Sequence, residues 1–308
     1  MIRATNRKLD PPEEFSADFQ AKSKTNNFYF IQGADTQLGL IYNWGPEGYG
    51  HGPEGMGKYP ESNWDEELEL CKKSVEILNS LTPRPAFFVV CGDLVDAFPD
   101  KFPEVRARQE KDLKEVYSKL SPEIPMICVC GNHDVGNAPT KETIETYKTS
   151  FGDDYFSFYK NCCCFIVINS QFYENSIHVP DLYAEHEQWL ASELKKAKSL
   201  NVNHVVIFQH IPWFVKEADE DKFYFNVEKE LRKTKLDQFY EAGVRKIFCG
   251  HFHRNAGGFY KDLEVVVTSA IGCQIGPDTH GMRVVRVNKD EITHHYHPLD
   301  NFPLKVTL

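Results

Sequence analysis

The sequence predicts an α/β (α+β) fold in which two sheets pack together and helices flank them. Five short apolar runs, rich in β-branched and aromatic residues, are typical of buried strands. Helical patterns lie between the first runs, as in βαβ units. Residues 264–270, 282–287 and 291–297 form three further strands set close together. We expect these three to make an antiparallel second sheet against the first.

Length and composition indicate one globular domain. The 308 residues can bury a sizeable core, and 41% hydrophobic with 26% charged residues is ordinary for such a domain. We expect residues 1–26 to be a polar lead-in and residues 27–300 to be the folded domain. The net charge of −10 argues against nucleic-acid binding, which requires a basic surface.

Cysteine usage and hydropathy predict a cytoplasmic location. Nine cysteines include no CxxC pair, and several lie in predicted buried strands, as expected of reduced core thiols. The N-terminus lacks the apolar segment of a secretory signal. No run approaches the ~18 apolar residues that a membrane span needs. We therefore expect no membrane association, and we expect a monomer.

Helical periodicity and turn residues divide the chain between the strands. Five helices are predicted. The first opens at residue 62 and repeats apolar residues from Trp64 to Leu78, and the others lie at residues 104–120, 143–151, 183–200 and 225–243. Residues 43–63 are rich in glycine and proline and predict a long loop, which either lines the substrate entrance or has no role there. We expect His51, within it, to be a surface histidine.

Each of the five apolar runs ends on side chains that can bind metal. The residues that follow the runs are Asp35 and Gln37; Asp93; Asn132 and His133; His210; and His251 and His253. Ligands bind at the carboxyl ends of strands in open α/β sheets. Carboxylates, amides and imidazoles that converge there predict a site for two divalent cations. His294, His295 and His297 are a weaker candidate, because alternation along a strand places them on different faces.

Five motifs, in order, resemble the calcineurin-like metallophosphoesterase family. They are Asp-x-Gln, Gly-Asp-Leu-Val-Asp, Gly-Asn-His-Asp, a lone histidine after a strand, and Gly-His-Phe-His, and they extend over residues 33–254. The resemblance implies that family's two-sheet sandwich flanked by helices. Asn-Ser-Gln-Phe-Tyr-Glu-Asn and Gly-His-Phe-His-Arg-Asn-Ala-Gly-Gly resemble a group within it that is regarded as cytosolic serine/threonine-protein phosphatases.

The resemblance also implies roles for individual residues. One cation would be held by Asp35, Gln37, Asp93 and His253, and the other by Asp93, Asn132, His210 and His251. Water that bridges two such cations loses a proton near neutral pH and can attack a phosphate in line. His133 would be the general acid, oriented by Asp96, while Asn132 and Arg254 would bind the phosphate.

Two residues depart from the family pattern. Gln37 replaces the usual histidine of Asp-x-His, so that cation could be loosely held and of the magnesium or manganese kind rather than iron or zinc. Alternatively, Gln37 only hydrogen-bonds a water on the metal. Ala97 stands where the well-known protein phosphatases have a phosphate-binding arginine.

These observations predict a metal-dependent phosphomonoesterase that acts on phosphoserine or phosphothreonine in phosphoproteins. Two alternatives remain open at this point. One is an enzyme that hydrolyses phosphodiesters such as cyclic nucleotides, because Gly-Asn-His-Asp also occurs in those enzymes. The other is an interaction protein that keeps a decayed metal site, which Gln37 and Ala97 suggest.

Overall fold

The computed structural model describes residues 27–44 and 63–308. The predicted lead-in at residues 1–26 lies outside the described residues, as does most of the predicted loop at 43–63, including His51. The first two residues of that loop belong instead to a short helix, α2 (Leu40–Trp44).

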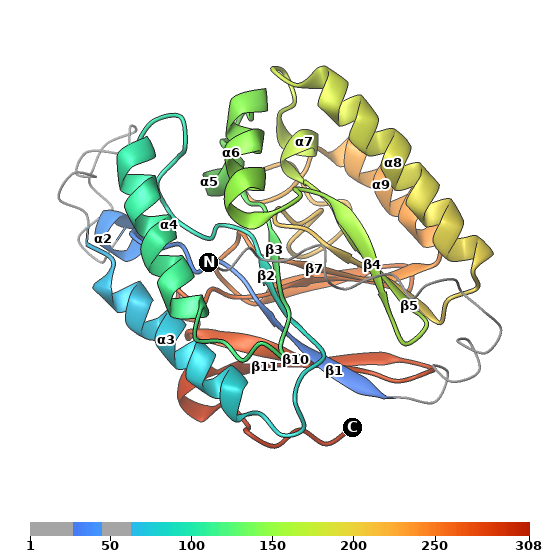
Figure 1. Cartoon of the computed structure of the whole chain (residues 1–308). Helices are drawn as coiled ribbons and strands as arrows, with labels where there is room; N and C mark the ends of the chain where they lie inside the picture. The colour runs from blue at the N-terminus through green and yellow to red at the C-terminus, as the bar shows by residue number, and fades with distance from the viewer. Residues whose placement is uncertain (1–26, 45–62) are drawn as a thin grey trace.

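Two mixed sheets form the centre of the molecule (Figure 1). In spatial order, the first sheet contains β11 (Ile292–Pro298), β10 (Gly281–Val287), β1 (Phe28–Gly33), β2 (Phe88–Cys91) and β3 (Met126–Val129). The second contains β4 (Phe156–Lys160), β5 (Cys163–Val167), β6 (His204–Phe208), β7 (Val244–Cys249), β9 (Leu263–Val267) and β8 (Ala256–Tyr260). The strands β1, β2 and β3 are parallel, as are β5, β6, β7 and β9, so their carboxyl ends share one edge.

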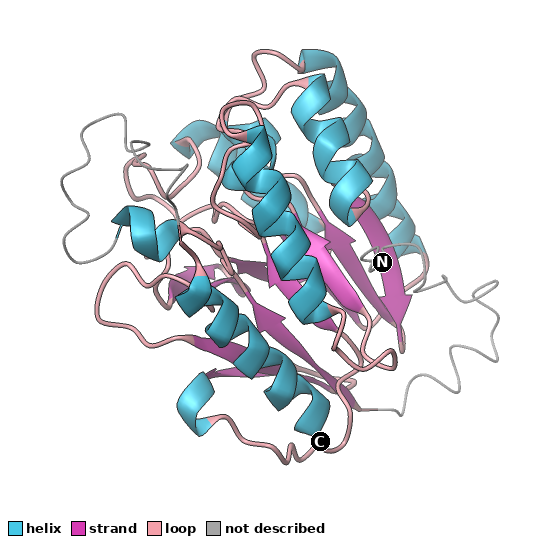
Figure 2. Ribbon diagram, turned by 60° about the vertical axis from the view of Figure 1, so that its left-hand side comes forward, coloured by secondary structure: helices cyan, strands magenta, loops and turns pink. Residues whose placement is uncertain are grey.

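Helices cover the outer face of each sheet (Figure 2). On the first sheet these are α3 (Asp65–Ser80), α4 (Pro103–Tyr117) and α6 (Lys141–Phe151), and on the second α8 (Pro180–Ser199) and α9 (Lys229–Glu241). Shorter elements are α5 (Asn132–Val135), α7 (Gln171–Glu174) and the 3₁₀ turn η2 (Leu299–Asn301). The five predicted helices are thus present, but α9 begins at Lys229 rather than at residue 225. None of the described helices combines the length and apolar character of a bilayer span.

The prediction that the last three strands form a sheet of their own is wrong. The strand β9 pairs in parallel with β7 in the second sheet, whereas β10 and β11 form a hairpin that joins β1 in the first. The apolar side chains of β10 explain this position. Val285 and Val287 pack between the sheets, while Met282 and Val284 pack under the outer helices. A strand that buries both faces belongs beside a central strand.

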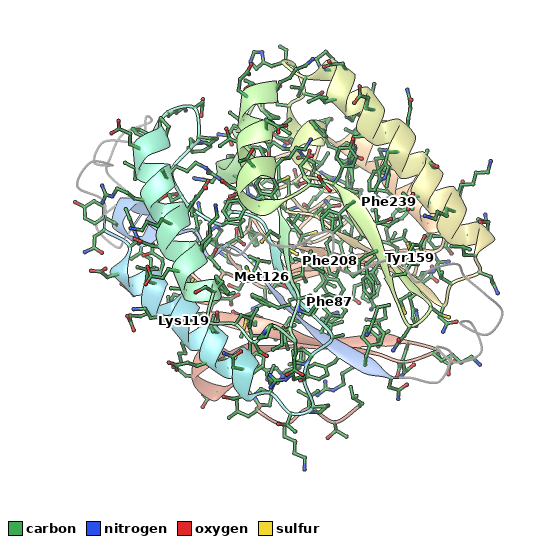
Figure 3. The ribbon with its side chains drawn as sticks, viewed as in Figure 1. Phe87, Lys119, Met126, Tyr159, Phe208 and Phe239 are labelled. Carbon is green, nitrogen blue, oxygen red and sulfur yellow. The ribbon has the colours of Figure 1, made fainter. Side chains whose placement is uncertain are left out.

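Aromatic rings fill the space between the two sheets, and we call this cluster the interlayer core (Figure 3). Phe30 of β1 and Phe87, which directly precedes β2, stack at 4.6 Å between ring centroids. Phe165 and Phe208, from the second sheet, stack at 5.8 Å. The two pairs meet edge to face, as at 5.6 Å between Phe30 and Phe208. Each such ring contributes roughly 1.5–3 kcal/mol through burial.

Candidate metal centre at the carboxyl ends of the strands

The predicted ligands meet where the strands of both sheets end. Asp35 and Asp93 follow β1 and β2 of the first sheet, while His210, His251 and His253 follow β6 and β7 of the second. All five side chains are buried. The site therefore lies across the junction of the two sheets and depends on both of them.

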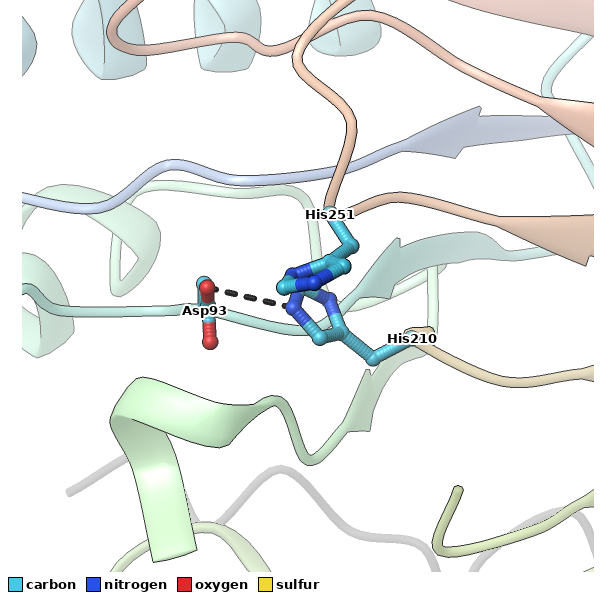
Figure 4. Close-up of side chains that lie close together, drawn as sticks. All are labelled: Asp93, His210 and His251. Carbon is cyan, nitrogen blue, oxygen red and sulfur yellow. Dashed lines mark ion pairs between the residues drawn. The ribbon is translucent and has the colours of Figure 1, made fainter. Parts of the chain in front are cut away.

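Asp93 belongs to two overlapping groups of possible ligands. Asp93, His210 and His251 form one group (Figure 4), and Asp35, Asp93 and His253 form the other. In each group the ligand atoms lie within 4.8 Å of one another. A carboxylate common to two sets of ligands is the arrangement expected for a bridge between two cations.

Interatomic distances show that Asn132 lies among these possible ligands. His210 Nε2 lies 3.1 Å from Asp93 Oδ2 and 3.1 Å from Asn132 Oδ1. His253 Nε2 lies 3.4 Å from Asp35 Oδ1. A nitrogen so close to carboxylate and amide oxygens could share one metal ion with them.

Backbone carbonyls fix the orientation of the three histidines. Each ring contacts one carbonyl oxygen: His210 Nδ1 that of Cys91 at 2.8 Å, His253 Nδ1 that of Cys273 at 2.5 Å, and His251 Nε2 that of Tyr224 at 3.3 Å. The ring nitrogen that carries the proton is then set, and the other nitrogen is left to bind metal.

The backbone at the site adopts an uncommon conformation. Five residues have positive φ between 30° and 70°, which disfavours non-glycine residues: Asp35, Gln37, Asp93, His251 and His253. Glycines permit the close approach of the segments. A Cβ on Gly92, whose φ is 85°, would lie 2.2 Å from His210 Nδ1, and one on Gly131 would lie 2.1 Å from Asp93 Oδ1. This explains why glycine precedes Asp93 and Asn132 in their motifs.

The electrostatics of the site fit bound cations. Burial raises the pKa of Asp35 well above its usual range, and the nearby Asp93 raises it further. Burial lowers the pKa of His253 to about 4 and that of His251 well below its ordinary value, so both rings are neutral and able to bind metal. Burial opposes the charging of His210, but Asp93 outweighs it and raises the pKa of the metal-free ring to about 9, so a cation that binds this ring would replace a proton. Divalent cations would relieve the repulsion between the two buried carboxylates.

Gln37 carries an oxygen suited to a metal. Its Nε2 donates to Asp96 Oδ1 at 3.2 Å, which leaves the amide oxygen as the remaining polar atom. Within the described part of the chain, the buried Oε1 has no hydrogen-bond partner. A buried acceptor that lacks a hydrogen-bond donor lowers the free energy of unfolding by about 1–3 kcal/mol. A cation, or a water molecule bound to a cation, would supply the missing partner of this oxygen.

His133 and Asp96 lie together beside the ligands. His133 Nδ1 contacts the Asp96 carbonyl oxygen at 2.6 Å and Asp96 Oδ1 at 3.2 Å, and its ring packs on Phe98. Burial opposes a charge on this ring, but Asp93 and Asp96 outweigh it and raise the pKa of His133 to about 9. These carboxylates favour the protonated form of the ring, with Nε2 as the nitrogen left to donate.

Arg254 follows the ligand His253 directly in the chain. Its Nε donates to the Ile275 carbonyl oxygen, and its guanidinium packs 5.2 Å from the Phe252 ring centroid. The structure thus ties Arg254 to the loop that also supplies the carbonyl oxygen of Cys273 to His253.

Two residues with supporting roles were missed in the sequence. Asp134, the last residue of Gly-Asn-His-Asp, accepts hydrogen bonds from the backbone nitrogens of Leu94 and Gly131 at 3.1 and 2.8 Å. The motif itself could have indicated it. Asn137 Oδ1 accepts from Asn132 Nδ2 at 3.0 Å, so that Asn132 presents its oxygen to the site. Nothing in the local sequence marks Asn137.

The histidines of β11 are arranged as the alternation predicted. His294 contacts Arg283 and Glu264, whereas the rings of His295 and His297 pack together at 4.6 Å. They form no group of metal ligands with the described histidines, cysteines and carboxylates.

Comparison with known proteins defines the class. The family described as calcineurin-like phosphoesterase matches residues 34–255. The chain belongs to this family, and the predictions of its fold and of a metal-dependent phosphoric ester hydrolase are confirmed.

Particular relatives resemble nearly the whole chain. It is 45% identical over 303 residues to serine/threonine-protein phosphatase CPPED1 of Bos taurus, covering 98% of this chain and 92% of that protein. It is 46% identical over 279 residues to the protein of the same name in Homo sapiens, covering 90% and 86%. A dimetal phosphatase from Danio rerio shares the fold, with a TM-score of 0.57, 13% identity, and coverage of 87% of this chain and 98% of that one.

Proposed function

We propose that this chain is a serine/threonine-protein phosphatase with two divalent cations bound at the shared carboxylate Asp93. The membership of Asp93 in both ligand groups is the observation that carries the proposal. The names of the relatives in Bos taurus and Homo sapiens support phosphoproteins as substrates.

The ligands divide into two sets. Asp35, Gln37, Asp93 and His253 would hold one cation, and Asp93, Asn132, His210 and His251 the other. When bound, divalent cations supply positive charge that neutralises the phosphate and lowers the pKa of water toward neutrality. The oxygen ligands around Asp35 and Gln37 suit manganese or magnesium, and the histidines also suit iron or zinc.

His133 would protonate the leaving oxygen of serine or threonine. Asp96 holds Nδ1 of the ring, so Nε2 delivers the proton as the bond between phosphorus and oxygen breaks. General acid catalysis of this kind is typically worth ~10²–10⁴-fold in rate. Asn132 and the terminal nitrogens of Arg254 would bind the phosphoryl oxygens.

A comparison of three substrates tests the proposal. We expect the manganese-loaded protein to release phosphate from a phosphoserine peptide faster than it hydrolyses bis(nitrophenyl) phosphate or cyclic AMP. Asp93→Asn protein, purified in the same way, controls for contaminating phosphatases. Faster turnover of either diester would replace the proposal by a phosphodiesterase. A protein that neither binds manganese nor releases phosphate would instead be an interaction protein.

We also propose a cytoplasmic, monomeric protein. All nine cysteines are buried thiols, which suits a reducing compartment. Fractionation of cells and light scattering after gel filtration would check location and oligomeric state.

A further inference from the structure

The segment between β6 and α9 places one exposed aromatic residue, Tyr224, beside the metal centre. It contains no helix or strand from residue 211 to residue 228. Phe223 is 40% exposed and Tyr224 is 59% exposed. The ring of Tyr224 lies 5.2 Å from that of His251, whose Nε2 contacts the Tyr224 carbonyl oxygen. An exposed tyrosine beside a buried polar site can contact a bound ligand through its apolar ring and its hydroxyl group.

A buried arginine holds this segment in place. Arg232 of α9 is fully buried, and it donates to the carbonyl oxygens of Val227 at 2.8 Å, Ala218 at 3.0 Å and Glu220 at 2.6 Å. A guanidinium bound by carbonyl oxygens fixes several turns of backbone at once. The segment is therefore held by hydrogen bonds from α9, even though it lacks regular secondary structure.

The tip that carries the aromatic residues is tied to the same network. Asn226 Oδ1 accepts from the Phe223 backbone nitrogen at 2.9 Å, and Asn226 Nδ2 donates to Glu220 Oε1 at 2.8 Å. Glu220 also accepts from the backbone nitrogens of Val215 and Lys216 at 2.8 and 2.9 Å. Tyr224 is consequently held beside the centre before any substrate arrives, which lowers the entropic cost of a contact with it.

The ring of Tyr224 lies beside a ligand of the centre. The ring lies 5.2 Å from that of His251, and the phenol is close enough to Asn132 and Asp93 for both to influence its pKa. Asn132 in turn lies 3.1 Å from His210 Nε2. The phenol is thus next to the place where a phosphoryl group would sit, and it can donate one hydrogen bond there.

We propose that Tyr224 is a substrate-binding residue whose hydroxyl donates a hydrogen bond to a phosphoryl oxygen of the bound phosphomonoester. The inference rests on the proposed function, because it assumes that phosphate binds at the metal centre. Its alternative is that Tyr224 only positions His251 through the backbone carbonyl. Substituting phenylalanine separates the two, since it removes the hydroxyl and keeps both ring and carbonyl.

The test is calorimetric titration of inorganic phosphate into manganese-loaded full-length protein. Tyr224→Phe should raise the dissociation constant about 10-fold or more, the range for a hydrogen bond to a charged group, while manganese content stays equal to wild type. Tyr240→Phe is the matched control: Tyr240 packs on Arg245 near the amino end of β7, away from the centre, and should change the constant less than about twofold.

Each other outcome has a defined meaning. Equal dissociation constants for Tyr224→Phe and Tyr240→Phe would overturn the inference, as would a loss of phosphate affinity that matches a loss of manganese. If Tyr224→Phe weakens phosphate binding but the wild type hydrolyses no phosphomonoester, the proposed function is wrong. The hydrogen bond from Tyr224 to phosphate is then still supported. If wild type binds no phosphate, both are overturned.

Discussion

The interlayer core and the metal centre occupy successive positions along the same parts of the chain and are both buried, but they differ in side-chain chemistry and in backbone conformation. On β6, Phe208 belongs to the core, and two residues later His210 belongs to the centre. The core consists of apolar side chains in ordinary strand backbone. The centre holds buried carboxylates and imidazoles, and five of its residues have positive φ.

The interlayer core therefore stabilises the fold, whereas the metal centre lowers stability and depends on the core to remain folded. Burial of aromatic rings favours folding, whereas buried charge and left-handed backbone each cost free energy. The two sheets must be packed for Asp93 to meet His210, because the residues come from different sheets. Substitutions in the two regions should therefore separate stability from activity.

Asp93→Asn should have the largest effect. The amide keeps the shape but removes the charge shared by both ligand groups. We expect turnover of a phosphopeptide to fall below detection, which is beyond the ~10–100-fold typical of residues that only support a metal ligand. Isothermal titration should show that both manganese sites are weakened. Loss of a single binding event would show that Asp93 does not bridge.

His133→Ala should impair turnover in a way that depends on the leaving group. Serine alkoxide leaves poorly without a proton, so a phosphoserine peptide should lose ~10²–10⁴-fold in rate, while nitrophenyl phosphate loses far less. Asp96→Asn should show the same bias more weakly, since Asp96 acts through His133. Equal losses on both substrates would assign His133 to phosphate positioning.

Phe30→Ala should affect stability instead of chemistry. Phe30 is fully buried and contacts rings from both sheets, so we expect the free energy of unfolding to fall by ~3–5 kcal/mol. Urea unfolding of metal-free protein measures this loss, with the 63%-exposed Phe259→Ala as a control near zero. Where Phe30→Ala remains folded, unchanged manganese affinity would support the separation of the two regions. A much weaker affinity would show that they are coupled.

Gln37 variants should have the smallest effect. If Gln37 Oε1 binds the cation, Gln37→His should lower the manganese concentration for half-maximal activity, and Gln37→Ala should raise it, each by up to ~10-fold. The histidine variant should also shift preference toward zinc or iron. Agreement of wild type and both variants within about twofold would show that Gln37 is not a ligand.

Local sequence signals were sufficient to predict the long helices, most of the strands and the candidate ligands that the centre brings together. The spacing of Trp64, Leu68, Cys71, Val75 and Leu78 predicted α3 because helix periodicity is a local property. The apolar runs that end at Asp35, Asp93, Asn132, His210 and His251 located the centre, since parallel strands share one edge. Helix periodicity and the position of a ligand after an apolar run can both be recognised from the order of residues in the chain.

Only the tertiary structure decided which strands share a sheet and what surrounds the ligands. The strand β1 is buried on both faces, so its sequence shows no alternation that could reveal β10 as its neighbour. The carbonyl oxygens that orient the histidines come from the backbone of Cys91, Tyr224 and Cys273, and any residue supplies the same carbonyl. Such contacts join distant parts of the chain and have no local sequence signal.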